Sequence, residues 1–217
     1  MLIATSVAVA GLASSLLTTR PLTPLPPLVI DVIAASDISP SLVTRVLTEA
    51  GDIWRAAGLT IIWKQDSHVS AAPRVTIGHW GNGVRREENA LPLGWIAFDE
   101  RGTPANAIYV SYANATALLD HTRGIGAVSD RMPRAEQETL LGRAMGRALA
   151  HELGHYLLGS KVHSAKGLMR AQRTSVEFFS TERSKFDVDA QQISIIAARL
   201  APQPLVATLQ SALVVGR

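Results

Sequence analysis

The sequence contains no cysteine among its 217 residues. This absence excludes disulfide bonds, zinc sites built from thiolates and cysteine nucleophiles. It does not assign a redox compartment, because a chain without cysteine is compatible with oxidising and with reducing surroundings. Any catalytic chemistry therefore has to come from other side chains.

A basic stripe is also missing. The formal net charge is only +3, and the longest basic cluster is the pair Arg85-Arg86, which two glutamates follow directly. Proteins that bind nucleic acid concentrate lysine and arginine on one face, where aromatic side chains often accompany them. We therefore expect no nucleic-acid partner, and the sequence does not indicate an oligomeric state.

The apolar N-terminus is too short for a typical membrane span. Residues 2–17 are apolar or small, and no charged residue precedes Arg20. About sixteen such residues fall short of the roughly twenty that a spanning helix needs, but they suit the apolar core of a signal peptide, although its usual positive start is missing. We expect residues 1–19 to be a signal peptide or a membrane anchor, so that the protein acts outside the cytoplasm. A buried N-terminal helix is the alternative.

The prolines divide the leader from the rest of the chain. Residues 20–27 contain four prolines, and proline at this density forms a stiff, extended linker. We find no internal repeat. The sequence therefore predicts one folded domain over residues 28–200, which a C-terminal tail of residues 201–217 follows.

Hydrophobic patterns within this domain predict both strands and helices. The predicted strands are 28–34, 59–63, 74–79, 94–99 and 107–111, and the predicted helices are 40–57, 113–120, 133–158 and 187–200. Ser39 and Pro40 are a typical helix start, and Gly58 is a typical helix end. The order predicts an α+β domain with a mixed twisted sheet, a long helix and a C-terminal helix.

The long predicted helix contains the sequence HELGH, from His151 to His155. Four residues advance a helix by slightly more than one turn, so His151 and His155 leave the same face and can share one zinc ion. Glu152 is placed to act as general base on a water molecule. Three histidines at the end of a helix, where the dipole favours a positive charge, are the alternative without a metal.

His163 is the candidate for a third ligand, because catalytic zinc sites commonly keep three protein ligands and one open position. Gly159 permits the chain to turn back after the helix, since glycine tolerates a positive φ. The competing ligand would be a glutamate on a later helix. Glu177 and Glu182 are the only downstream glutamates, and we predict that neither lies in a helix.

The segment HELGHYLLGSKVHSAKGLM resembles the active-site segment of metzincin zinc peptidases. The resemblance implies that His151, His155 and His163 are zinc ligands and that Glu152 is the general base. It also implies a zincin-like fold and a methionine turn under the metal, which Met169 would supply; an ordinary core methionine is the alternative for Met169. The loop before His163 is two residues longer than in the family pattern.

These features predict a zinc-dependent metallopeptidase that hydrolyses a peptide or protein substrate. Residues 94–98 are a candidate edge strand with which an extended peptide could pair, or an ordinary strand of the sheet. Two other functions stay open, namely a zinc-binding module without activity and a zinc hydrolase of a non-peptide amide. We interpret His68, His79 and His121 as surface or structural residues and Tyr156 and Trp95 as packing residues.

Overall fold

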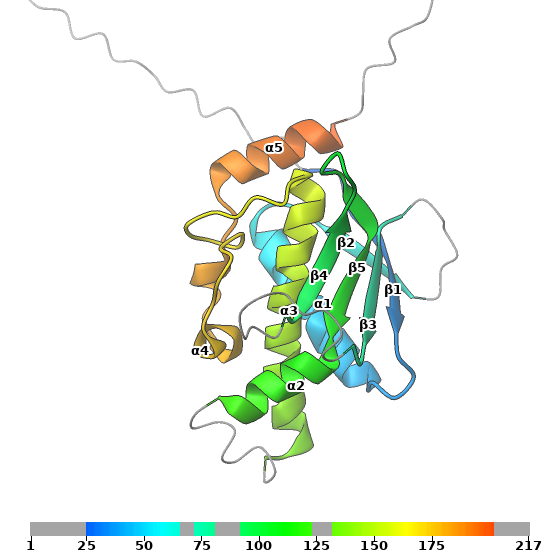
Figure 1. Ribbon diagram of the computed structural model, residues 1–217, viewed down its shortest axis with the longest axis vertical. Helices are drawn as coiled ribbons and strands as arrows, with labels where there is room; N and C mark the ends of the chain where they lie inside the picture. The colour runs from blue at the N-terminus through cyan, green and yellow to red at the C-terminus, as the bar shows by residue number, and fades with distance from the viewer. Residues whose placement is uncertain (1–24, 66–71, 81–91, 123–131, 202–217) are drawn as a thin grey trace, which may run out of the picture.

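The computed structural model describes residues 25–65, 72–80, 92–122 and 132–201 (Figure 1). Its helices and strands alternate along the chain. In order they are β1 (Leu28–Ala34), α1 (Pro40–Ala56), β2 (Ile61–Gln65), β3 (Arg74–Gly78), β4 (Gly94–Phe98), β5 (Pro104–Ser111), α2 (Tyr112–His121), α3 (Arg134–Leu158), α4 (Ser175–Phe179), a 3-10 helix (Ser184–Phe186) and α5 (Ala190–Leu200).

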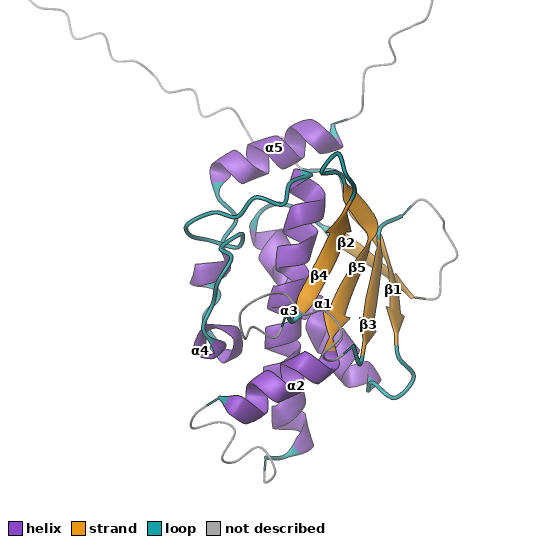
Figure 2. Cartoon of the chain, viewed as in Figure 1, coloured by secondary structure: helices purple, strands orange, loops and turns teal. Residues whose placement is uncertain are grey.

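The described strands form one mixed sheet (Figure 2). Their order in the sheet is β2-β1-β3-β5-β4. Strands β2, β1, β3 and β5 run parallel to their neighbours, whereas β4 runs antiparallel to β5. This arrangement confirms the predicted α+β class with a mixed sheet. It also places β4 at one edge of the sheet.

Helices α1 and α3 pack against each other and cover one face of this sheet (Figure 1). Alternate residues of the central strands are buried beneath them, because successive side chains of a strand point to opposite faces. These buried strand residues are Ile30, Val32, Val75, Ile77, Ile108 and Val110. The core thus lies between the sheet and the two long helices and holds α3 firmly beside β4 and β5.

The start of α1 is the one that the sequence predicts. The Ser39 hydroxyl accepts a hydrogen bond from the Leu42 amide at 3.2 Å, and Pro40 occupies the first turn. Gly58 follows the helix with a φ of 85°. The next strand begins two residues later than predicted, because the Leu59 amide still donates to the Trp54 carbonyl at the end of the helix.

The segment after α3 is more ordered than the sequence predicts. Residues 175–179, which we expected to be irregular, form α4, and its first turn is closed by a capping box between Thr174 and Glu177. The prediction that Glu177 is non-helical is therefore wrong. Its carboxylate accepts hydrogen bonds from the Thr174 amide and Arg170 and does not compete for the histidine site.

The last helix begins at Ala190 and not at residue 187, because the Asp189 carboxylate caps it by accepting from the Gln192 amide at 2.8 Å. Within the described ranges, no helix is both long and apolar enough to cross a membrane. The predicted leader of residues 1–19 and residues 202–217 of the tail lie outside the described residues.

Candidate metal centre

Helix α3 brings two histidines of the HELGH sequence together. The Nε2 atoms of His151 and His155 lie 3.1 Å apart. Two nitrogens that each lie about 2.0–2.1 Å from one tetrahedral zinc ion are separated by about 3.3 Å. The spacing along the helix has therefore placed both ring nitrogens at a separation that suits a shared ion.

The third predicted ligand, His163, returns to the same point from the loop after α3. Its ring stacks on that of His151 at a centroid distance of 5.3 Å and meets the ring of His155 edge to face at 4.9 Å. One ligand atom from each of the three histidines lies within 4.8 Å of the others. The longer loop does not keep His163 away from the two helical histidines.

Gly159 makes this return possible. Its φ of 61° is left-handed, and it ends α3 while its amide donates to the carbonyls of His155 and Tyr156. A residue with a Cβ adopts this conformation at a cost, whereas glycine does not. The sequence prediction of a turn at Gly159 agrees with this geometry.

Hydrogen bonds on the other ring nitrogen orient the two helical histidines. Nδ1 of His151 bonds to the Leu168 carbonyl, and Nδ1 of His155 bonds to the Ser160 carbonyl, both at 2.8 Å. A backbone carbonyl can only accept, so both Nδ1 atoms carry the proton and donate it. In the neutral ring each Nε2 then carries a lone pair, and the two Nε2 atoms converge. Histidines that bind metals are commonly held in this way.

The electrostatic surroundings also keep His151 neutral. Burial is the main cause that lowers the pKa of His151 from 6.5 to about 4; the hydrogen bond to the Leu168 carbonyl opposes this shift, and the neighbouring His155 and His163 add to it. A neutral imidazole is the form that binds a metal. The donor set of three imidazoles, together with a chain that lacks cysteine, fits a divalent transition metal such as zinc.

The side chain of Glu152 extends from α3 toward the edge strand β4. A Cβ built on Gly94 of β4 would come within 3.1 Å of the Glu152 Cγ and of the Tyr109 carbonyl oxygen. A side chain at position 94 would therefore push the glutamate away. Sequence reasoning placed Gly94 in a strand but missed this role, which depends on a contact between distant segments.

Met169 packs under α3. It is 1% exposed, and its thioether occupies the space into which a side chain at Gly154 would project. The preceding residue, Leu168, supplies the carbonyl that orients His151. The turn with Met169 thus supports the helix between its two histidines.

Residues that the sequence analysis assigned to packing or to the surface lie as follows. Trp95 stacks on Tyr109 at 5.3 Å, and Tyr156 is half-buried. His79 pairs with Asp37 at 2.7 Å, whereas His68 lies outside the described residues. Among the residues that the structure describes, no group of three histidine, aspartate or glutamate side chains other than His151, His155 and His163 converges on one point.

A network of arginines that the sequence did not indicate supports the loop after α3. Arg147 of α3 is buried, donates to Glu49 of α1 at 2.9 Å, and also donates to the Glu182 carbonyl at 2.9 Å. Arg173 donates to the carbonyls of Gly167 and Leu168. No local pattern marks these residues, because their partners lie far away in the sequence.

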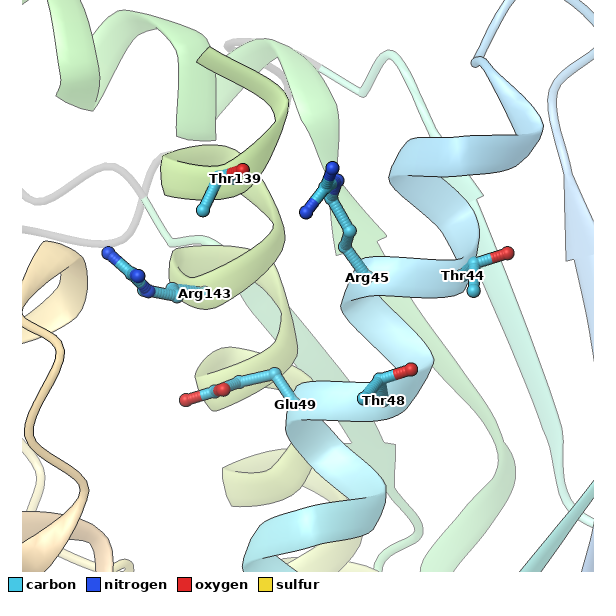
Figure 3. Close-up of a pocket in the computed structure, with 6 residues that line it drawn as sticks. All are labelled: Thr44, Arg45, Thr48, Glu49, Thr139 and Arg143. Carbon is cyan, nitrogen blue, oxygen red and sulfur yellow. The ribbon is translucent and has the colours of Figure 1, made fainter. Parts of the chain in front are cut away.

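A separate groove lies between α1 and the first half of α3 (Figure 3). Figure 3 shows the residues that line it, which are Thr44, Arg45, Thr48, Glu49, Thr139 and Arg143. Arg143 precedes His151 by eight residues, or about two helical turns. The groove contains none of the predicted site residues and is distinct from the histidine cluster.

No protein-family model matches the chain, and no curated protein matches it in sequence. Among solved structures, the fold is similar to that of an archaemetzincin (amzA) from Methanopyrus kandleri, with a TM-score of 0.45 and 13% sequence identity. The match covers 80% of this chain and 94% of the archaemetzincin chain. A likeness at this distance assigns no function, so the case for the site rests on the residues themselves.

Proposed function

We propose that this chain is a zinc-dependent peptidase in which His151, His155 and His163 hold the metal and Glu152 is the general base. The observation that carries the proposal is the convergence of three imidazoles beside a helical glutamate. A bound zinc ion would act as a Lewis acid that polarises a carbonyl group. It would also lower the pKa of a water molecule, so that the water can lose a proton and attack near neutral pH.

The residues of the chain would perform the remaining steps. Glu152 follows His151 on the helix and is half-buried beside β4. Its carboxylate would take the proton from the attacking water and pass it to the leaving nitrogen. The carbonyls of Leu168 and Ser160 would keep the helical imidazoles oriented throughout.

The position of β4 favours a peptide as substrate. The strand is at the edge of the sheet, Gly94 lies against Glu152, and the Phe98 ring meets the His155 ring at 6.0 Å. An extended peptide can add to a free sheet edge through backbone hydrogen bonds. Pairing with β4 would carry a peptide past both the glutamate and the histidines.

The first test is the zinc content of the purified full chain beside that of His163→Ala. We expect about one zinc per chain in the parent and a much weaker site in the variant, because a ligand is lost. His121→Ala, which removes a histidine from α2, is the matched control and should keep the zinc. A parent without zinc would overturn the proposal, and full retention in His163→Ala would remove that residue from the ligand set.

The second test concerns the reaction. Glu152→Gln should retain zinc but cleave quenched peptides at least about 100-fold more slowly, since a general base contributes about 10²- to 10⁴-fold. A chelator should abolish cleavage by the parent. Zinc binding without cleavage of any peptide would favour a binding module or an amidase with another substrate, and full activity of Glu152→Gln would refute the role of Glu152.

We also propose that the protein acts outside the cytoplasm, on the basis of its apolar residues 2–17. A reporter enzyme that is active only after export, fused behind residue 27, tests this. Activity of the fusion supports export, and an inactive fusion that stays in the cytoplasm contradicts it.

A further inference from the structure

The turn that orients His151 is itself held by Arg173. One terminal nitrogen of its guanidinium, Nη2, donates to the Gly167 carbonyl and, at 3.2 Å, to the Leu168 carbonyl. The other terminal nitrogen donates to the Lys185 carbonyl at 3.1 Å. Arg173 therefore connects the turn before Met169 to the segment that precedes α5.

The Leu168 carbonyl serves two donors at once. Nδ1 of His151 donates to it at 2.8 Å, and Nη2 of Arg173 donates to it at 3.2 Å. A carbonyl oxygen has two lone pairs and can accept both hydrogen bonds. The imidazole and the guanidinium thus share one acceptor, and the guanidinium helps to fix the position of the Leu168 carbonyl oxygen.

The guanidinium of Arg173 is in turn anchored to the core. It lies 3.9 Å from the ring centroid of Phe186, and the buried guanidinium of Arg147 lies 4.6 Å from the same centroid. Phe186 is only 2% exposed. A cation over a buried aromatic face is attracted to it and loses freedom of movement. Arg147 belongs to α3 and lies one helical turn before His151. The same helix therefore carries His151 and one of the two arginines that pack on Phe186.

We propose that Arg173 is a positioning residue for the metal centre, which fixes the Leu168 carbonyl and through it the ring of His151. The inference rests on the proposed function, because it presumes that His151 binds a metal. Arginine suits this place better than lysine, since its planar guanidinium can bond several carbonyls while it lies over a ring.

The test compares the zinc affinity of the full chain with that of Arg173→Ala, in competition with a chromophoric chelator. We expect the variant to bind zinc about tenfold more weakly or worse, because loss of partners behind the ligands costs about 10- to 100-fold in metal affinity. The visible absorption of the Co²⁺-substituted variant should also shift, because His151 would be less well oriented.

Arg170→Gln is the matched control. Arg170 lies in the same segment and donates to the Gln172 carbonyl and to Glu177, but it has no hydrogen bond with the Leu168 carbonyl among those of the described residues. Its variant should keep the zinc affinity within about twofold and the Co²⁺ spectrum of the parent. An equal loss in both variants would mean general destabilisation and would overturn the positioning role.

Parent-like affinity and spectrum in Arg173→Ala would also overturn it. If Arg173→Ala does not fold, Arg173→Lys decides, since it keeps the charge without the planar group: weaker zinc binding supports the inference and parent-like binding contradicts it. A parent that binds no zinc would instead refute the proposed function. Failure of the proposed function is therefore distinguishable from failure of the positioning role of Arg173, which shows only when the parent binds zinc.

Discussion

At the scale of single residues, Gly154 is the position where the helix and the methionine turn lie closest. Gly154→Ala gains helix propensity of about 1 kcal/mol, but its methyl group would displace the Met169 thioether. Overpacking of a core costs about 1–3 kcal/mol. We expect a net loss of stability in urea unfolding and weaker zinc binding, because Leu168 moves with Met169.

The double variant Gly154→Ala/Met169→Ala provides the control for this prediction. Space opens where the thioether was, so the two substitutions should cost less together than the sum of their separate costs. Strictly additive losses would show that the methyl group and the thioether do not compete for one space.

The half-buried imidazole of His151 should make the metal-free fold sensitive to acid. Its pKa is lowered from 6.5 to about 4 by burial, so between these values the unfolded chain binds a proton that the folded chain does not. Stability is then lost as the pH falls from 6.5 to 4, by about 3 kcal/mol at the lower limit.

Urea unfolding in the presence of a chelator, at pH 7 and at pH 4.5, measures this loss. The parent should lose more stability between the two pH values than His151→Gln, which has no imidazole to titrate at this position. Equal losses would show that the acid sensitivity arises from other groups.

At the scale of elements, the end of α3 depends on the backbone conformation of Gly159. Alanine at this left-handed position costs about 1–2 kcal/mol, and its Cβ would also meet the guanidinium of Arg199 from α5, which is the end of an exposed side chain that can move aside. Gly159→Ala should therefore lower both the stability and the zinc affinity, since the loop that carries His163 starts here.

Gly58→Ala is the matched control for this element. Gly58 also has a positive φ, but a Cβ there would meet no atom within 4 Å. The control should lose stability in thermal unfolding and keep the zinc affinity. A similar loss of zinc in both variants would contradict a specific role for the turn at Gly159.

The helices and strands with strong local signals could be predicted from the sequence. The start of α1 at Ser39-Pro40 and the end of α3 at Gly159 depend on residues within one turn of the boundary. Helix α4 was missed although Thr174 and Glu177 have the spacing of a capping box, because the helix is only five residues long and Arg147 holds its Glu177 carbonyl from across the fold.

At the scale of the whole molecule, Glu49 links α1, α3 and the segment before α5. It is 6% exposed and bonds to Arg147 and Arg183. Removing one partner of a buried ion pair costs about 3–5 kcal/mol, because the other charge stays buried. Glu49→Gln should therefore lower the stability strongly, as urea unfolding would show.

Arg134→Ala provides the comparison, since Arg134 pairs with Glu138 on the surface. An exposed pair contributes about 0–1 kcal/mol. A small effect of both substitutions would mean that the buried pair does not hold the segments together.

The candidate site could be predicted only in part, because some of its contacts join segments that lie far apart in the sequence. The spacing of His151 and His155 follows from helix geometry alone, and the proposed roles of these residues stay predictions until zinc is measured. The positions of Gly94, Leu168 and Arg173 depend on how the sheet, the turn and the arginine network meet in three dimensions. A single sequence carries no signal for such contacts.

The three histidines, the glutamate and both orienting carbonyls all lie between residues 151 and 169. Within this stretch the spacing on α3 is fixed, because one residue inserted between His151 and His155 would turn the two imidazoles to different faces of the helix, whereas the loop before His163 can differ in length and still return that histidine to the cluster. Elsewhere, an insertion at a surface loop such as 99–103 would leave their relative placement intact. Chains descended from a common ancestor could thus drift apart over most of their length and still inherit a working centre.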